Sequence, residues 1–122
     1  LETVQQGTAF AKITQSVYNI SIPPGPLPIA VGYACKIENI DLNKLLPLYL
    51  HAFVANLILV AVRFIPIGQT DGQKILLRLF DTIEDISMNT IDLELEDLCS
   101  SCFLNDIDTM KHETMKTRIF RS

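Results

Sequence analysis

Two cysteines near the C-terminal end of the sequence have the spacing of a metal or redox motif. Cys99 and Cys102 form a C-x-x-C pair, and His112 follows ten residues later. A redox pair of this kind normally follows a β-strand, and this sequence predicts none before it. A structural zinc site needs two more ligands at matched spacing. We therefore interpret the cysteines as structural, and keep Cys99, Cys102 and His112 as candidate metal ligands.

The other acid–base side chains form no catalytic motif. His51 lies in an apolar segment, where a histidine packs in a core or interface more often than it binds a ligand. His112 and Glu113 could form an acid–base pair, but no nucleophile accompanies them, so a surface or interface role is preferred. The sequence contains no nucleophile elbow, zinc-protease motif or phosphate-binding glycine loop. We predict that the protein is not an enzyme and binds no cofactor tightly.

A dense polar segment lies between two apolar ones. Arg63 closes the first apolar segment, and a turn containing Pro66 and Gly68 follows. Four polar residues come next: Gln69, Thr70, Asp71 and Gln73. Thr70 and Gln73 have the spacing of a capping box, which would place a helix start at Thr70. Capping does not require so many consecutive polar groups, which also favours a docking surface.

Hydrophobic periodicity predicts that helices position these residues. Residues 1–18 have apolar side chains at helical spacing, and residues 19–28 contain four prolines and form a loop. A short helix is expected over residues 29–38, with Pro28 at its first position.

The predicted central element is a helix from Leu42 to Phe64, roughly 33 Å long. Asp41 is its expected N-cap, Pro47 should bend it or shift its start, and Ile65 before Pro66 should end it. Because the helix is apolar on nearly all sides, we expect it to be buried at the centre of a bundle.

The remaining segments are also predicted to be helical. One amphipathic helix is expected from the capping box to about residue 89, and a last helix is marked by Phe103, Ile107 and Met110. Residues 91–98 alternate like a strand, but no partner strand is expected, so a loop with a helical turn is preferred. The predicted fold is all-α: a single domain over residues 1–122, with five to six helices around a buried central helix (about 42–64).

Composition narrows the function further. The length of 122 residues suits one domain, and a net charge of −4 without a basic block disfavours a nucleic-acid partner. Nine of the fourteen acidic residues lie between Asp81 and Asp108, which is typical of a solvated helix face. Three cysteines without a signal peptide favour the reducing cytoplasm.

Residues 45–62 form an apolar stretch that reaches the minimum length of a transmembrane helix. His51 and Asn56 are polar groups near the middle of this segment, and no basic cluster or aromatic belt flanks it. We therefore predict a core helix and no membrane partner. The first residue is Leu1, which suggests a fragment of a longer chain.

The stretch HAFVANLILVAVRFIPIGQTDGQK, residues 51–74, resembles the signature of the urease accessory protein family UreF. It contains the Asn-Leu pair at 56–57, the Ala-Val-Arg step at 61–63, a Pro-hydrophobic-Gly turn at 66–68 and Gln-Thr-Asp-Gly-Gln at 69–73. The C-terminus is similar too, with a His-Glu pair and a closing Arg-hydrophobic-Phe-Arg-Ser at 118–122. The family's N-terminal Pro-x-Gly-x-(Phe/Tyr) and Gly-Leu-Glu pieces are missing, which also favours a fragment.

This resemblance implies an all-α scaffold without catalytic activity. UreF proteins are homodimers that bind UreD (also called UreH); the complex recruits the GTPase UreG and delivers nickel to apo-urease. By position, Arg63 matches a basic site on the UreG-facing surface, and the tail around Arg118 matches the segment that becomes ordered with UreD/UreH. The predicted partner-binding residues are Arg63, Gln69, Thr70, Asp71, Gln73, His112, Arg118 and Phe120. The alternative is a chaperone that binds nickel directly through Cys99, Cys102 and His112.

Overall fold

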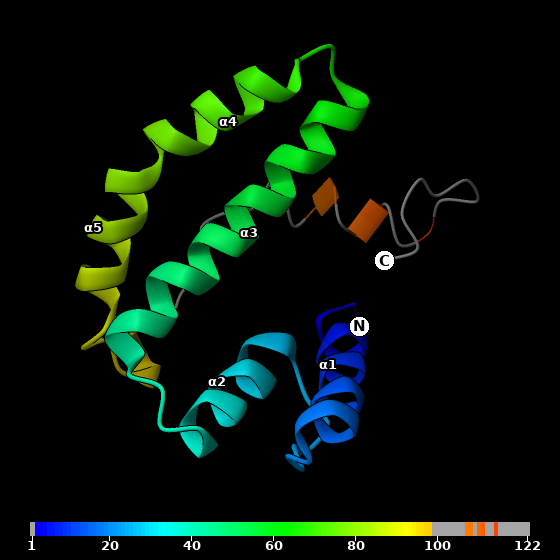
Figure 1. The fold of residues 1–122 in the computed structure, drawn as a ribbon, viewed down its shortest axis with the longest axis vertical. Coiled ribbons are helices and arrows are strands. Elements are labelled where there is room, and N and C mark those ends of the chain that lie inside the picture. The colour runs from blue at the N-terminus through cyan, green and yellow to red at the C-terminus, as the bar shows by residue number, and fades with distance from the viewer. Residues whose placement is uncertain (1, 99–106, 109, 112–113, 115–122) are drawn as a thin grey trace. The chain divides into compact units, whose positions relative to one another are not determined.

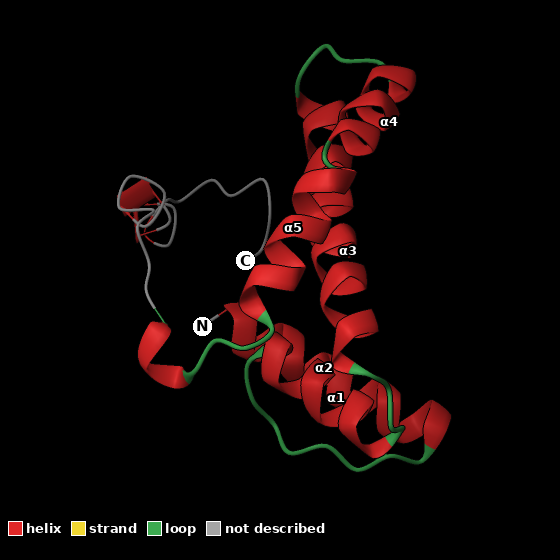
Figure 2. Cartoon of the chain, turned by 90° about the vertical axis from the view of Figure 1, so that its left-hand side faces the viewer, coloured by secondary structure: helices red, strands yellow, loops and turns green. Residues whose placement is uncertain are grey.

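The computed structural model describes residues 2–98, 107–108, 110–111 and 114. Within this part of the chain all regular structure is helical, which confirms the all-α class (Figures 1 and 2). The elements are α1 (Glu2–Tyr18), α2 (Leu27–Ile37), α3 (Leu42–Phe64), α4 (Gln69–Arg78), α5 (Phe80–Thr90) and a 3₁₀ helix (Leu95–Asp97). Residues 3–92 form one compact unit, and residues from Leu93 onward belong to a second.

Small residues bring α1 and the proline-rich loop together. Gly7 of α1 is buried, and a Cβ added there would lie 2.7 Å from the Leu27 nitrogen and closer still to the Gly25 carbonyl oxygen. Four buried residues form the core beside this contact: Ala11, Ile22, Ala30 and Ala34. Because three of these four residues are alanines, the backbone segments can approach one another closely.

Local chemistry sets the end of α2. Asn39 has a φ of 54°, a left-handed conformation that asparagine tolerates. The Asn39 amide donates to the Lys36 carbonyl at 3.2 Å, and the Ile40 amide donates to the Cys35 carbonyl at 2.8 Å. This pair of bonds is a Schellman motif, which satisfies carbonyls that the helix end leaves free.

The predicted bounds of α3 are confirmed at both ends. The Asn43 amide donates to Asp41 Oδ1 at 2.9 Å, so Asp41 is the N-cap. Hydrogen bonds from the Asn43 backbone and side chain lower the pKa of the Asp41 carboxyl. The Ile65 amide closes the last turn by donating to the Ala61 carbonyl at 2.8 Å. Pro47 lies inside α3 and does not shift its start.

The segment after the turn differs from the prediction in two ways. The N-cap of α4 is Gly68, not Thr70, and no side chain caps this end, so the capping-box prediction is wrong. The Gly72 amide donates to the Gly68 carbonyl at 3.0 Å, which starts the helix before Thr70. The expected single helix is also divided at Leu79, which separates α4 from α5.

The prediction that α3 is buried is wrong for this chain. The helices α4 and α5 contact α3 and follow it along one side (Figure 1). No residue of α3 is buried, and Leu48, Phe53 and Phe64 are each more than half exposed. Two neighbouring helices cannot enclose a helix that is apolar on nearly all sides.

By length and a mean hydropathy of 2.1, α3 is also the one described helix that could cross a bilayer. None of its most apolar window is buried. The prediction against a membrane partner therefore stays a prediction.

The acidic segment after α5 follows the sequence prediction. The 3₁₀ helix Leu95–Asp97 is the expected helical turn, and no strand forms at residues 91–98. Its start is held by the Glu94 amide, which donates to Asp97 Oδ2 at 2.9 Å. Ile107 and Met110 are helical as predicted, whereas Phe103 lies outside the described residues.

Candidate functional site

The candidate docking corner is the junction of α3 and α4. Arg63 lies in the last turn of α3, a turn at residues 65–68 reverses the chain, and α4 begins at Gln69 (Figure 1). All five predicted partner-binding residues of this region are exposed: Arg63, Gln69, Thr70, Asp71 and Gln73. Their role in binding stays a prediction.

A glycine that the sequence analysis did not single out fixes the geometry of this corner. Gly72 is buried, and a Cβ added to it would lie 2.9 Å from Val62 Cγ2 and 3.1 Å from Ile58 Cγ2. This close contact lets α4 pack directly on α3. The sequence signal was a glycine inside a helix between exposed polar residues, which can mark a close approach of two backbones.

The helix geometry places Arg63 and the start of α4 on different faces. Ile58 and Val62 face Gly72, and each residue of a helix turns by about 100°. Arg63 therefore lies well around α3 from the side that contacts α4. The corner presents two adjoining surfaces, one with Arg63 and one with the first turns of α4.

The charges at the corner are solvated. Asp71 and Lys74 form an ion pair at 3.1 Å on the exposed side of α4, and an exposed pair of this kind contributes little to stability. Asp71 also lies in the first turn of α4, where the helix dipole favours a negative charge. Arg63 forms no ion pair with any residue that the structure describes. Its guanidinium is thus available to a carboxylate from outside the chain.

His51 packs against a neighbouring helix, which agrees with the prediction of a core or interface histidine. Its ring lies 5.4 Å from the ring of Phe80, centroid to centroid, at an angle of 37°. The pair joins the middle of α3 to the first residue of α5. The described part of the chain contains no group of three His, Cys, Asp or Glu side chains that could hold a metal ion.

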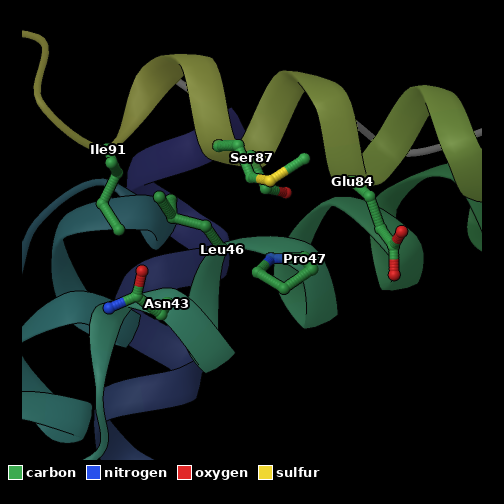
Figure 3. Close-up of a pocket in the computed structure, with 7 residues that line it drawn as sticks. Asn43, Leu46, Pro47, Glu84, Ser87 and Ile91 are labelled. Atoms are coloured by element: carbon green, nitrogen blue, oxygen red, sulfur yellow. The ribbon is translucent and has the colours of Figure 1, made fainter.

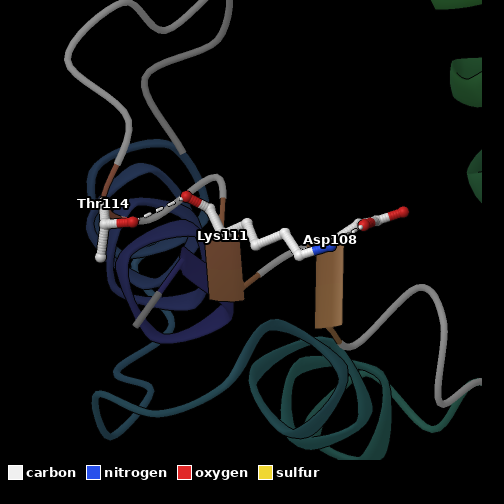
Figure 4. Close-up of polar contacts among 3 residues, drawn as sticks. All are labelled: Asp108, Lys111 and Thr114. Carbon is white, nitrogen blue, oxygen red and sulfur yellow. Dashed lines mark hydrogen bonds and ion pairs between the residues drawn. The ribbon is translucent and has the colours of Figure 1, made fainter.

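The candidate metal ligands lie outside the described residues. These are Cys99, Cys102 and His112, and the tail residues Arg118 and Phe120 lie outside as well. Nearby, Lys111 pairs with Asp108 at 3.3 Å, and the Thr114 hydroxyl donates to the Lys111 carbonyl at 2.9 Å (Figure 4). The third cysteine, Cys35, is half-buried, which raises the pKa of its thiol.

One hollow between α3 and α5 was not predicted. It has a volume of about 270 Å³, and Figure 3 shows Glu84 near one end and Asn43 and Ile91 near the other. The Ser87 hydroxyl donates to the Ile83 carbonyl at 2.7 Å, and the Asn43 amide group donates to Asp41 Oδ1 at 2.9 Å. The side chains of Ser87 and Asn43 are therefore engaged by local hydrogen bonds. Pro47 lies on the wall of this hollow.

Comparison with known proteins gives a consistent result. Urease accessory protein UreF of Cereibacter sphaeroides is 42% identical over 121 residues, which cover 99% of this chain and 58% of that protein. UreF of Ruegeria pomeroyi is 41% identical over 122 residues (100% of this chain, 56% of that protein). UreF of Bradyrhizobium diazoefficiens is 37% identical over 131 residues (100% and 54%). This chain thus spans little more than half the length of these relatives.

The UreF family profile matches residues 1–80, which include α1 to α4 and the whole corner from Arg63 to Gln73. The UreF relatives are about 40% identical to this chain over nearly its full length. The matched region includes the signature at residues 51–74. This chain therefore belongs to the UreF family.

Proposed function

We propose that this chain serves urease maturation as a non-catalytic accessory protein. The observation that carries the proposal is the family match, because it spans the exposed corner between α3 and α4. The relatives are named urease accessory proteins.

The proposed partners are UreD/UreH, the GTPase UreG and apo-urease, and nickel is the cargo of the assembly. Arg63 would contribute a charge-assisted hydrogen bond to a carboxylate of UreG, since an arginine can bind a carboxylate with two parallel bonds. Gln69, Thr70 and Gln73 would supply adaptable hydrogen bonds from the first turns of α4. The contact at Gly72 supports this role because it holds α4 against α3 before any partner arrives.

The C-terminal residues His112, Arg118 and Phe120 are proposed to bind UreD/UreH. The tail combines basic residues with the apolar anchors Ile119 and Phe120. A short segment of this kind gains affinity from the anchors and loses conformational entropy as it docks. The complete accessory protein is proposed to act as a homodimer in the cytoplasm.

Arg63→Ala tests the proposal directly. The tagged chain is used to capture purified UreD/UreH and UreG, first as wild type and then as the variant. Arg78→Ala is the matched control, because Arg78 is also an exposed arginine in the last turn of a helix. We expect Arg63→Ala to reduce UreG capture by about tenfold or more, which corresponds to one charge-assisted bond, and Arg78→Ala to leave it unchanged.

Equal capture by the two variants would reject the role of Arg63. No capture of either partner by the wild-type chain would reject the scaffold proposal for this portion of the protein. Calorimetry with Ni²⁺ on the wild type and on a Cys99→Ser/Cys102→Ser variant tests whether this chain itself binds nickel through these cysteines. Heat in the wild type that the double variant lacks would favour the nickel-binding alternative.

A further inference from the structure

The helix α3 has two seams of residues along its length, and α4 and α5 cover one of them. On the covered seam, His51 contacts Phe80, and Ile58 and Val62 lie against Gly72. We call the second set of residues the outer seam: Leu45, Tyr49, Ala52, Asn56 and Leu59. At about 100° per residue, the outer seam is centred roughly 120° around α3 from the covered seam.

The outer seam has the spacing of a helix-packing surface. Its residues follow one another at intervals of four, three, four and three, the heptad pattern by which one helix packs along another. Ala52, Asn56 and Leu59 are exposed, and Tyr49 is half-buried. Leu45 borders a hollow with residues of α2, so the open part of the seam runs from Tyr49 to Leu59. This part is about 15 Å long, or three helical turns.

The surroundings of the seam are unsuited to water. No charged residue occurs between Lys44 and Arg63, whereas a solvent-facing helix side normally carries charges. Leu48 and Phe53, on either side of the seam, are also each more than half exposed. A continuous apolar surface of this extent marks an interaction site. Asn56 is the one polar residue on the seam, and it needs a hydrogen-bond partner once it is covered.

The comparison with relatives indicates where the covering element comes from. This chain spans 54–58% of the length of the UreF proteins it matches, so more than 40% of each relative lies outside the matched region. A helix in the same polypeptide has a high effective concentration at the seam, which favours it over a second copy of the chain.

We propose that the outer seam of α3 is the docking site for an amphipathic helix from the part of the protein that this chain does not span. That helix carries apolar residues at heptad spacing and one amide or hydroxyl side chain that bonds to Asn56. Asn56 sets the register, as a single polar residue does in a coiled-coil seam. Arg63 follows the seam at its end, so its long side chain stays free at the rim.

The test uses the full chain and peptides of about 25 residues, long enough to cover the seam as helices. The peptides overlap and cover the part of the Cereibacter sphaeroides UreF outside the matched 121 residues. Binding is measured by fluorescence anisotropy, and peptide helicity by circular dichroism. We expect one peptide, or two neighbours, to bind and become helical.

Ala52→Arg is the decisive variant, and Ala9→Arg is its matched control. Both alanines are exposed residues of helices, and arginine is nearly as good a helix former as alanine, so both variants should fold. We expect Ala52→Arg to weaken peptide binding at least tenfold and Ala9→Arg to leave it unchanged. Absence of binding by every peptide, or equal binding by both variants, would overturn the proposal.

Two further measurements identify a different occupant. Light scattering reports whether the chain alone forms a dimer that Ala52→Arg separates. Co-sedimentation with phosphatidylcholine–phosphatidylglycerol vesicles reports whether the chain binds a bilayer and whether Ala52→Arg prevents it. Either result without peptide binding would assign the seam to a second copy or to a membrane and would overturn the proposal. Neither measurement contains UreD or UreG, so a failure here is distinct from a failure of the proposed scaffold role.

Discussion

The contact between α1 and the proline-rich loop gives a sharp prediction for Gly7→Ala. A methyl group at this position would meet the Gly25 carbonyl oxygen, the Leu27 nitrogen at 2.7 Å and the Pro26 carbonyl carbon at 2.8 Å. All three are backbone atoms, so the clash is relieved only if the loop moves away from α1. Overpacking of this kind costs about 3 kcal/mol, at the upper end of its usual range.

Helix propensity acts in the opposite direction. Alanine is favoured over glycine inside a helix by about 1 kcal/mol, so the net loss for Gly7→Ala is about 2 kcal/mol. Gly32 in α2 provides the matched control, because a Cβ added there would meet no atom within 4 Å. Gly32→Ala should therefore increase the free energy of unfolding by about 1 kcal/mol.

Urea denaturation followed by far-UV circular dichroism measures both variants. The two free energies of unfolding should differ by about 3 kcal/mol, with opposite signs relative to wild type. Hydrogen exchange supplies a local readout, and Gly7→Ala should accelerate exchange in α1 and α2 before it affects α3. If Gly7→Ala stabilises the chain as much as Gly32→Ala does, the close approach of the loop to α1 is refuted.

Three further substitutions probe the corner and α3. Gly72→Ala should cost less than Gly7→Ala, because it meets side-chain methyl groups that can shift slightly; a larger loss in urea denaturation would contradict this. His51→Ala should lower the free energy of unfolding through the loss of buried surface and by a further amount of about 1 kcal/mol from the lost ring contact with Phe80. A double-mutant cycle with Phe80→Ala measures the ring contact alone. Asp41→Ala should destabilise the chain above the unfolded-state pKa of aspartate. Because the folded-state pKa of Asp41 is lowered, its contribution is lost as the pH falls through that value, and an effect independent of pH would exclude the cap.

The parts of the fold that depend on local chemistry could be predicted from the sequence. The bounds of α3 follow from the Asp41 cap and from Ile65 before Pro66, and these act over one turn of backbone. The N-cap of α4 was predicted two residues late, since Thr70 is a good cap but Gly68 already has extended backbone dihedrals and accepts the first helical bond. The division at Leu79 has no glycine or proline to signal it.

The features that depend on contacts between helices were less accessible. The polar residues at the start of α4 could be identified from their types, and their exposure agrees with the prediction. The separation of Arg63 from them could not, because it depends on which side of α3 contacts α4. The importance of Gly72 depends on the same contact. Burial of α3 was predicted wrongly because periodicity reports how apolar a helix is, not whether neighbouring helices are present to cover it.

The exposure of α3 also connects the two proposals. Full burial of one large apolar side chain is favourable by about 1.5–3 kcal/mol, and Leu48 and Phe53, which flank the outer seam, are both more than half exposed. A helix that covers the outer seam would thus gain several kcal/mol and would hold α3 from both sides. Arg63 and the first turns of α4 extend from the end of that helix, so their positions become as rigid as α3 itself. The affinity of the corner for UreG should therefore rise when a seam-binding peptide is present, and Ala52→Arg should remove the increase without changing the affinity of the chain alone.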